Sequence, residues 1–386
     1  MDDTHELARA EVSTPPARTA PGTNGRPDDE SLINAHTDVE AIDVWLARYA
    51  DSASTQESCR KEGARFLMWI QMRGLELSTV RVEDVNDYKA FLADPQPAEI
   101  WVGKRRPRMV DGRPNPLWRP FNGPLSKASI KQSATILFGL FEFLVSANWL
   151  RANPWRLTSK VRVVKDEHIE RYLAPTARDA LFSYVRQLST SDDKLLRAHG
   201  VRSYWLLTVF YLAGPRRSEV ANARMADIYR DVKGWWWRIT GKGNKTADVP
   251  LTADFVDLMK VYRTHYSLPP LPSPAETDIP LVGDVYTGRR PASATVIYRV
   301  IVELCRRAAE TVDDPWAREQ LINASPHWLR HTSASDQLNE AKLPLLVVSK
   351  NHRHANISTT APYLHVERSE RHDAVQAHHL PKAQPE

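Results

Sequence analysis

The sequence is poor in cysteine and in long apolar segments, and both shortages exclude whole classes of protein. Two cysteines, Cys59 and Cys305, among 386 residues cannot build a disulfide framework, and no Cys-x-x-Cys pair is present. No stretch approaches the roughly 20 apolar residues of a membrane span, and the N-terminal residues lack the apolar core of a secretory signal. We therefore expect a reduced, cytoplasmic protein with no membrane partner.

A phosphate-binding P-loop is also absent, so the sequence does not indicate ATP chemistry. What the chain does have is positive charge, and this charge is distributed unevenly. The net charge is +5, but residues 1–37 hold seven acids and three arginines, a net charge of −4, which leaves +9 for the remainder. A basic body favours a polyanionic partner, most often nucleic acid, although this feature alone is weak evidence.

The N-terminal part of the chain is predicted to be a tail followed by helices. Residues 1–37 are rich in Pro, Thr, Ala, Asp and Gly, and their lack of hydrophobic periodicity predicts disorder. From Asp38 the pattern becomes helical. The first predicted helix has an apolar face made of Val39, Ile42, Trp45, Leu46 and Tyr49.

Three more helices complete a small helical domain over residues 38–155. Ser54 and Glu57 form a candidate capping box for the second helix, which should end at Gly74. A short third helix covers residues 82–94. The fourth should run from Ser126 until the Asn153-Pro154 pair ends it, with one apolar side made of Ile130, Leu137, Leu140, Phe141 and Leu144.

A proline-rich, basic stretch interrupts this domain at residues 93–124. Within it, the basic run "GKRRPRMVDGRP" (103–114) has five positive charges and one acid, Asp111. The positive charges belong to Lys104, Arg105, Arg106, Arg108 and Arg113. A solvated loop and a loop that contacts DNA phosphates fit this composition equally well.

A second domain should follow a linker at residues 156–168. We place it at residues 169–370, with a C-terminal tail at 371–386. It is mostly helical, but the alternation in "WWWRIT" (235–240), the "GKGN" turn and the returning "KTADVPL" predict one β-hairpin. The fold class is therefore mainly α with a small β-sheet, in an α+β C-terminal domain.

The stretch "FYLAGPRRSEV" joins two helices of this domain. Gly214-Pro215 is a strong helix stop, and a new helix begins at once with Arg216 and Arg217. An arginine at a helix start lies where backbone N–H groups already favour anions, and its guanidinium can hold two phosphate oxygens. A local ion pair between Arg216 and Glu219 is the plainer alternative.

The predicted hairpin carries a lysine at its tip. Lys242 in "GKGNKT" would reach outward from a tight turn, where a lysine of lowered pKa can donate a proton to a leaving oxygen. Lys245 competes with it for that role. Hairpin tips also carry lysine simply for solubility, and for this stretch alone that interpretation is better supported.

"SPHWLRHTSA" places three basic side chains on one helix face. Ser325 can cap the helix and Pro326 suits its first position, so His327, Arg330 and His331 fall at i, i+3 and i+4. A histidine pair with this spacing can bind zinc, but here an arginine would direct a cation toward a cation. Electrostatics therefore favours an anionic ligand held by Arg330 and His327.

The last informative stretch is "HRHANISTTAPYLH". Ser358 or Thr359 can cap a short helix in which Tyr363 lies near the start, nine residues after His354. A tyrosine hydroxyl is a poor nucleophile unless nearby cations lower its pKa. An ordinary half-buried tyrosine is the alternative, and the histidines of this region fit no zinc spacing.

Taken in order, these stretches resemble the tyrosine recombinase (phage integrase) family. "GPRRSE" is similar to its Gly-Leu-Arg-x-Ser-Glu box, "GKGNK...VPL" to its Gly-Lys-Gly hairpin, and "HWLRHTSA" to its His-x-Leu-Arg-His box. "RHANISTTAPY" resembles the segment that ends at the family's tyrosine. The resemblance covers residues 169–366 in detail, whereas 38–155 resembles the core-DNA-binding domain only in size, order and helicity.

The resemblance implies a recombinase or integrase that cleaves and rejoins double-stranded DNA, with the two domains forming a clamp. Tyr363 would form a 3′-phosphotyrosine, Arg216 and Arg330 would hold the phosphate, and Lys242 would protonate the leaving 5′-oxygen. His327 would assist as acid or base, and His354 would donate a hydrogen bond. No metal or other cofactor is implied. Family members act as tetramers on paired recombination sites, often on mobile elements and with accessory proteins.

The chain departs from the family pattern at Pro215, at Arg353, where the family has glycine, and at Pro362 beside the tyrosine. Two other functions remain compatible with the sequence. A type IB-like topoisomerase would share the residue set but need no paired site, and an inactive DNA-binding accessory protein would not cleave.

Overall fold

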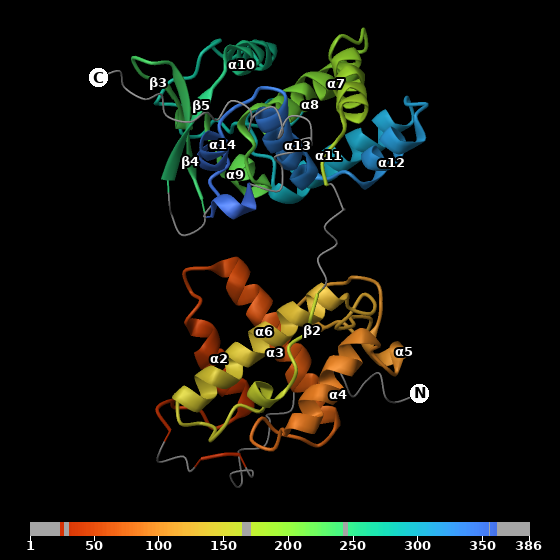
Figure 1. Cartoon of the computed structure of the whole chain (residues 1–386), viewed down its shortest axis with the longest axis vertical. Helices are drawn as coiled ribbons and strands as arrows, with labels where there is room; N and C mark the ends of the chain where they lie inside the picture. The colour runs from red at the N-terminus through yellow and green to blue at the C-terminus, as the bar shows by residue number, and fades with distance from the viewer. Residues whose placement is uncertain (1–23, 27–30, 164–170, 242–245, 355, 361–386) are drawn as a thin grey trace, which may run out of the picture. The chain divides into compact units, whose positions relative to one another are not determined.

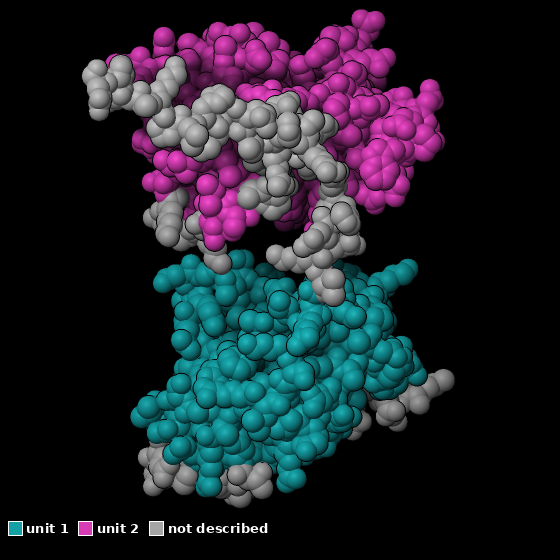
Figure 2. Space-filling view, viewed as in Figure 1, with its two compact units in different colours: residues 1–166 teal, residues 167–386 magenta. Residues whose placement is uncertain are grey.

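The computed structural model describes residues 24–26, 31–163, 171–241, 246–354 and 356–360, and the chain forms two compact units (Figures 1 and 2). Unit 1 comprises residues 1–166 and unit 2 residues 167–386. The division falls within residues 156–168, the stretch that the sequence indicates as a linker.

Unit 1 is built from helices around an aromatic core. Phe66 lies at its centre, because its ring packs edge-on against Tyr88 at 4.9 Å, Phe141 at 5.8 Å and Trp155 at 6.0 Å between centroids. These contacts join four elements of the unit. In chain order the elements are α2 (Asp38–Ala47), α3 (Ala53–Met72), α4 (Val82–Ala93), α5 (Ala98–Trp101), β1 (Met109–Val110), β2 (Arg113–Pro114), α6 (Lys127–Ser146) and η2 (Pro154–Leu157).

Several expectations for unit 1 were wrong in detail. α3 begins at Ala53 after Ser52, so Ser54 lies inside the helix and makes no capping box with Glu57. α6 ends at Ser146, well before Asn153-Pro154, because the chain turns at Asn148 with φ of 56°. Val39 is exposed rather than part of the apolar face of α2.

Part of the stretch predicted to be disordered packs on unit 1. Backbone N–H of Asn24 donates to the Ser78 carbonyl at 3.0 Å, and the Asn24 side chain donates to the carbonyl of Ala152 at 2.9 Å. Ala35 belongs to the core, with 5% of its surface exposed. These contacts satisfy backbone groups and bury an apolar side chain, which composition alone does not reveal.

One helix among the described residues, α6, is long and apolar enough to cross a membrane by length and composition. The sequence was not expected to contain such a segment. Its apolar side chains Leu137, Leu140, Phe141 and Leu144 are fully buried in the core of unit 1, which explains their apolar character.

Unit 2 is mainly helical with one small sheet. Its elements are α7 (Pro175–Ser189), α8 (Lys194–Ala213), α9 (Arg217–Asn222), η3 (Met225–Asp227), β3 (Ile228–Arg230), β4 (Trp235–Thr240), β5 (Thr246–Leu251), α10 (Ala253–His265), α11 (Ala294–Ala309), α12 (Pro315–Asn323), α13 (Pro326–Asn339), α14 (Leu345–Asn351) and η4 (Ile357–Thr359). The predicted fold class, mainly α with a small sheet, is confirmed.

The sheet of unit 2 has the order β3-β4-β5, and both pairs are antiparallel. The predicted hairpin is confirmed, with Trp235 opposite Leu251 and Thr240 opposite Thr246. Alternation works as expected, because Trp237 and Ile239 face the core while Arg238 and Thr240 are exposed. Strand β3 was not predicted, since three residues are too short for a periodic pattern.

Helix α8 is the central element of unit 2. Trp205, Leu207 and Phe210 on it are fully buried, and the Trp205 indole donates to the Leu281 carbonyl at 2.7 Å. As expected, α8 ends at Gly214, whose φ of 55° suits glycine. This ending matters because Arg330 and His352 both contact Gly214, and Arg216 follows two residues later.

Candidate active site

Helix α13 and the end of α14 pack against the end of α8. The ring of His352, at the end of α14, lies against Gly214 so closely that a Cβ on Gly214 would be 2.3 Å from the ring's Cε1. Gly214 is therefore required twice, once for its left-handed backbone and once for this contact. His352 is fully buried, and its Nε2 lies 3.5 Å from Ser333 Oγ on α13.

Arg330 ties the same three segments together from α13. Its side chain is 4% exposed. One terminal guanidinium nitrogen donates to the Gly214 carbonyl and the other to the His352 carbonyl. The fork of a guanidinium suits this double contact, which fixes the charge at the junction of α8, α13 and α14.

Glu219 on α9 is the second organising residue. Its side chain is nearly buried, and it accepts the backbone N–H of Arg216 at 2.6 Å and the Arg216 guanidinium at 2.9 Å. It also pairs with the Arg353 guanidinium at 2.7 Å. Burial would raise the pKa of Glu219, but Arg353 and Arg216 outweigh this effect and hold its pKa below the ordinary value.

The local ion pair that the sequence left open, Arg216 with Glu219, is thus present, and it does not consume Arg216. The Arg216 side chain remains 47% exposed, and its other terminal nitrogen donates to the Arg353 carbonyl at 3.2 Å. Glu219 therefore orients an arginine that still faces solvent. An exposed and oriented guanidinium is what a phosphate ligand needs.

The structure explains how an arginine is accommodated at position 353, where the family has glycine. The φ of Arg353 is 53°, the left-handed region that glycine adopts without strain. Its side chain is 9% exposed and folds back to Glu219 and to the Asn351 carbonyl. The long side chain next to His354 is therefore directed toward α9, where an ion pair offsets the backbone strain.

Three histidines surround the arginines and are neutral near pH 7. His327 and His331 lie one turn apart on α13 with ring centroids 4.0 Å apart. Loss of hydration lowers the pKa of all three histidines, and Arg330 and other nearby cations lower it further. The pKa of His354 falls to about 4, and that of His331, which also lies beside His327, falls to about 3. The fixed positive charge therefore comes from the arginines.

Thr360 holds the His354 ring in place. The ring Nδ1 lies 2.6 Å from Oγ1 of Thr360, a fully buried residue that ends η4. Asn356 caps η4 through the N–H of Ser358, so the predicted caps Ser358 and Thr359 lie within this 3-10 helix. The helix predicted around Tyr363 lies outside the described residues.

Comparisons with known proteins identify this arrangement. Residues 181–370 match the model of the phage integrase family. Tyrosine recombinase XerC of Staphylococcus epidermidis is 23% identical over 315 residues, which cover 82% of this chain and 87% of the relative. XerC of Thermodesulfovibrio yellowstonii is 28% identical over 242 residues, covering 63% of this chain and 72% of the relative. The chain belongs to the tyrosine recombinase family.

Solved structures share its fold. The XerH recombinase bound to a palindromic difH substrate matches with a TM-score of 0.59 and 14% identity, covering 97% of this chain and 94% of that chain. The Tn1549 transposon integrase in complex with circular intermediate DNA matches with a TM-score of 0.58 and 13% identity, covering 88% and 99%. The chain is a site-specific recombinase that works through a tyrosine intermediate, as the family assignment implies.

The recombinase brings together four of the six predicted catalytic residues: Arg216, His327, Arg330 and His354. Lys242, Tyr363 and the competing Lys245 lie outside the described residues. Lys104, Arg105, Arg106 and Arg108 belong to unit 1, where all four are exposed. Among the described residues no group of three His, Cys, Asp or Glu side chains could hold a metal ion.

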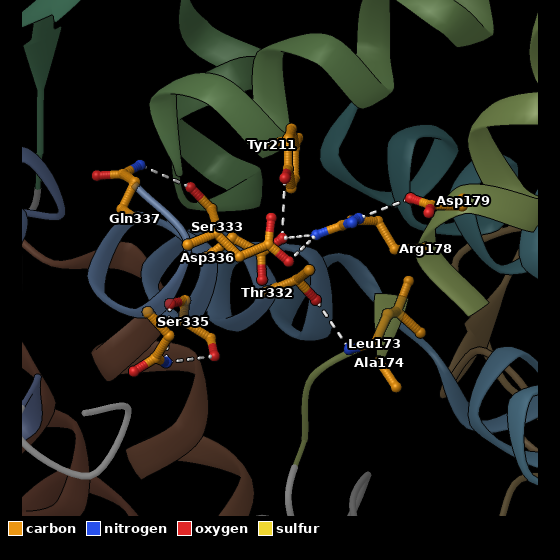
Figure 3. A network of polar contacts seen from close by, with 12 residues as sticks. Leu173, Ala174, Arg178, Asp179, Tyr211, Thr332, Ser333, Ser335, Asp336 and Gln337 are labelled. Carbon is orange, nitrogen blue, oxygen red and sulfur yellow. Dashed lines mark hydrogen bonds and ion pairs between the residues drawn. The ribbon is translucent and has the colours of Figure 1, made fainter. Parts of the chain in front are cut away.

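A polar network behind the site holds α13 in register, and sequence reasoning missed it (Figure 3). Arg178 on α7 pairs with Asp336 at 2.7 Å, and the Tyr211 hydroxyl on α8 donates to the same carboxylate at 2.8 Å. Thr332, next to His331, accepts the N–H of Leu173 at 2.9 Å. The network therefore connects α13 with α7, α8 and the beginning of unit 2.

No motif pointed to these supporting residues. Arg178, Tyr211 and Asp336 are far apart in the sequence, and each is an ordinary polar residue on an amphipathic helix. The i, i+4 spacing of Asp336 and Glu340, both bonded to Arg178, was the only available signal. His352 lies in a histidine-rich stretch that fits no metal spacing, and only its burial shows that it belongs to the packing around Gly214.

Proposed function

We propose that Tyr363 attacks a DNA phosphate held by Arg216 and Arg330. The observation that supports this assignment is the pair of arginines at one backbone junction, one buried and fixed by carbonyls, the other exposed and oriented by Glu219. Phosphoryl transfer depends mainly on positioning and on fixed positive charge, and this junction supplies both.

The proposed reaction is balanced without a cofactor. The Tyr363 oxygen forms a bond to phosphorus as its proton leaves, and the bond from phosphorus to the DNA 5′-oxygen breaks. Lys242 gives a proton to that oxygen, and His327 serves as acid or base for the tyrosine proton. His354, oriented by Thr360, donates a hydrogen bond to a phosphate oxygen. The phosphotyrosine keeps the energy of the phosphodiester, so rejoining is the reverse of cleavage.

Unit 1 is proposed to contact DNA through residues 104–113. All ten residues are exposed, and they include Lys104, Arg105, Arg106 and Arg108. The hairpin of β1 and β2 overlaps the end of this stretch, with Asp111 and Gly112 at positive φ in its two-residue turn. A two-stranded ribbon fits the major groove of DNA, so the stretch can carry charge to the phosphates on a defined backbone.

At the level of assembly, the proposal follows the family. The recombinase would act in the cytoplasm as a homotetramer on paired sites, with the two units enclosing double-stranded DNA and with accessory proteins for some reactions. A mobile element is the expected genetic setting. The relatives XerC and the Tn1549 integrase support a DNA partner, and the domain limits 38–155 and 169–370 are proposed as the functional division.

The experiment that tests this function traps the covalent intermediate. The full chain is incubated with a nicked duplex that covers a candidate site, the mixture is denatured, and DNA bound to protein is measured. The wild type should retain DNA, and Tyr363→Phe should retain none. Retention by Tyr363→Phe would show that another residue is the nucleophile, and a need for only one copy of the site would favour a topoisomerase.

A further inference from the structure

A cavity of about 440 Å³ lies between α7, α8 and α11, away from the recombination site. Its apolar walls include Leu188, Leu196 and Leu304, and its polar lining includes His199, Arg202 and Arg299. Glu303 also lines the cavity, and its carboxylate is already paired with Arg306 and Arg307. Arg202 and Gly214 lie twelve residues apart on α8, which corresponds to about 18 Å along the helix axis. The cavity is therefore separate from the catalytic junction.

Arg202 is the unusual residue of this cavity. Its side chain is 8% exposed, and its Nε is buried without a hydrogen-bond partner. Within the part of the chain that the structure describes, no hydrogen bond or ion pair joins its guanidinium to another residue. Every other arginine of unit 2 that is buried as deeply has a partner: Arg263 pairs with Glu276, and Arg330 donates to two carbonyls.

Asp284 is the one acid that acts on the charge of Arg202, and it does not pair with Arg202. Burial lowers the pKa of Arg202, and Tyr266, Tyr262 and Asp284 oppose that effect from a distance. The Asp284 carboxylate is already occupied by its own loop, where it accepts the N–H groups of Tyr286, Thr287 and Arg290 and the Thr287 hydroxyl. Arg202 therefore carries a largely buried charge that no described carboxylate pairs with directly.

A buried charge without a partner is strongly unfavourable, so its presence beside a cavity indicates a missing anion. A guanidinium prefers an oxyanion that can accept two parallel N–H bonds. The leucine walls suit an apolar group next to that anion. Arg299 at the rim is exposed and adds a second positive charge.

We propose that this cavity binds a carboxylate attached to an apolar group, with Arg202 as its charge partner. The carboxylate can belong to a free organic acid or to an acidic side chain flanked by apolar residues in a polypeptide. Both sources present the same chemistry to Arg202. Neither involves the residues that hold the DNA phosphate.

The test measures the melting temperature of the full chain against two probes. Hexanoate represents the free acid, with hexanol as its uncharged control. A short peptide with one glutamate between two leucines represents the polypeptide, with the glutamine version as its control. At ten times its dissociation constant, at least one acidic probe should raise the melting temperature by about 3 °C, and the uncharged controls should not.

Arg202→Met is the deciding variant. It should lose the rise in melting temperature, and without a probe it should melt at or above the temperature of the wild type, because an unpaired charge has been removed. If Arg202→Met does not fold, Arg299→Ala must weaken binding of the active probe at least threefold. Unchanged binding in that variant would contradict the proposal.

Three further outcomes would overturn the inference. The first is no rise with either acidic probe. The second is an equal rise with hexanol or with the glutamine peptide, which would mean that charge is irrelevant. The third is a rise with inorganic phosphate that matches the acidic probes, which would replace the proposed class by a simple anion site.

Discussion

The two units bury very different side chains. Among the described residues of unit 1, one charged side chain is buried, Glu62, inside a core of aromatic rings. Unit 2 buries four, and His352 with them: Arg202, Glu219, Arg263 and Arg330. Burying a charged side chain is unfavourable unless partners are supplied, so each buried charge of unit 2 requires a structural or functional explanation.

The comparison also shows that burial alone does not identify a catalytic residue. Glu62 pairs with Arg65, which donates to the Pro120 carbonyl and so fixes a loop of unit 1. Arg263 has a similar role in unit 2, where it pairs with Glu276 and donates to loop carbonyls. Arg330 differs because its partners are the carbonyls at the ends of α8 and α14, which meet at the candidate active site.

The largest effect should come from Arg330→Lys. A lysine keeps the charge but cannot donate to both carbonyls at once. We expect the rate of covalent DNA capture to fall at least 10²-fold and the free energy of unfolding to fall by about 2–3 kcal/mol. Single-turnover trapping and urea denaturation measure the two quantities.

Arg263→Lys is the matched control, since it removes a buried guanidinium of the same unit from a structural ion pair. It should destabilise unit 2 by a similar amount and leave the rate of DNA capture within about threefold of wild type in the folded protein. An equal loss of rate in both variants would mean that the effect of Arg330 is one of stability alone.

Glu219→Gln comes next, and its expected effect is a loss of stability. It leaves the nearly buried Arg353 guanidinium without a counter-charge, so we expect a loss of about 3 kcal/mol in the free energy of unfolding. Adding Arg353→Gly should restore most of it, because glycine removes the orphaned charge and suits the φ of 53°. A double variant that is no more stable than Glu219→Gln would contradict the proposed pairing.

The two units also differ in how well their structure could be predicted from the sequence. Unit 2 was predictable where chemistry is local: the stop at Gly214, the hairpin strands and the face that carries His327 and Arg330 each depend on residues within one turn or one strand pair. In unit 1 the four predicted helices are present as α2, α3, α4 and α6, but the short α5, the start of α3 and the end of α6 were not predicted. Competing caps such as Ser52 and Asn148 have no periodic signal.

The supporting contacts could not be predicted, because they join residues that are distant in the sequence. Glu219 and Arg353 are separated by 134 positions, and Arg178 and Asp336 by 158. The sequence showed Arg353 only as a departure from glycine. Its φ and its ion pair together explain how an arginine is accommodated there, and neither is visible without the fold.

A change of pH should affect the units unequally. In unit 2 the pKa values of His352, His331 and His354 lie below the ordinary value of 6.5, so the folded unit stays deprotonated where the unfolded chain binds protons. Its free energy of unfolding should therefore fall as the pH drops from about 6.5 toward 4, by about 1 kcal/mol per pH unit or more. Hydrogen exchange resolved by segment at pH 7.5 and 5.5 measures this loss.

In unit 1 the one described histidine, His36, is exposed, so its segments should change little over the same interval. His331→Gln supplies the control within unit 2, since it removes one of the groups that the unfolded chain protonates. The dependence of stability on pH should become shallower in this variant. Equal losses in both units would place the responsible groups elsewhere.

The smallest effect on stability should come from the exposed charges of unit 1. Replacing Arg105, Arg106 and Arg108 by alanine should change the free energy of unfolding by less than about 0.5 kcal/mol. If these residues contact phosphates, DNA affinity should still fall, and the slope of log affinity against log salt should become shallower by about 3. Filter binding at several salt concentrations gives both values.

Removing three exposed charges elsewhere in unit 1, at Arg60, Lys61 and Lys131, is the matched control and should leave the salt slope nearly unchanged. The contrast is informative because the net charge of the two variants is the same, so a general electrostatic attraction would weaken equally in both. A steeper loss in the 105–108 variant requires contact at the loop itself. Unit 1 would then bind DNA through surface charges, whereas the candidate site of unit 2 combines the buried Arg330 with an exposed Arg216 that the buried Glu219 orients.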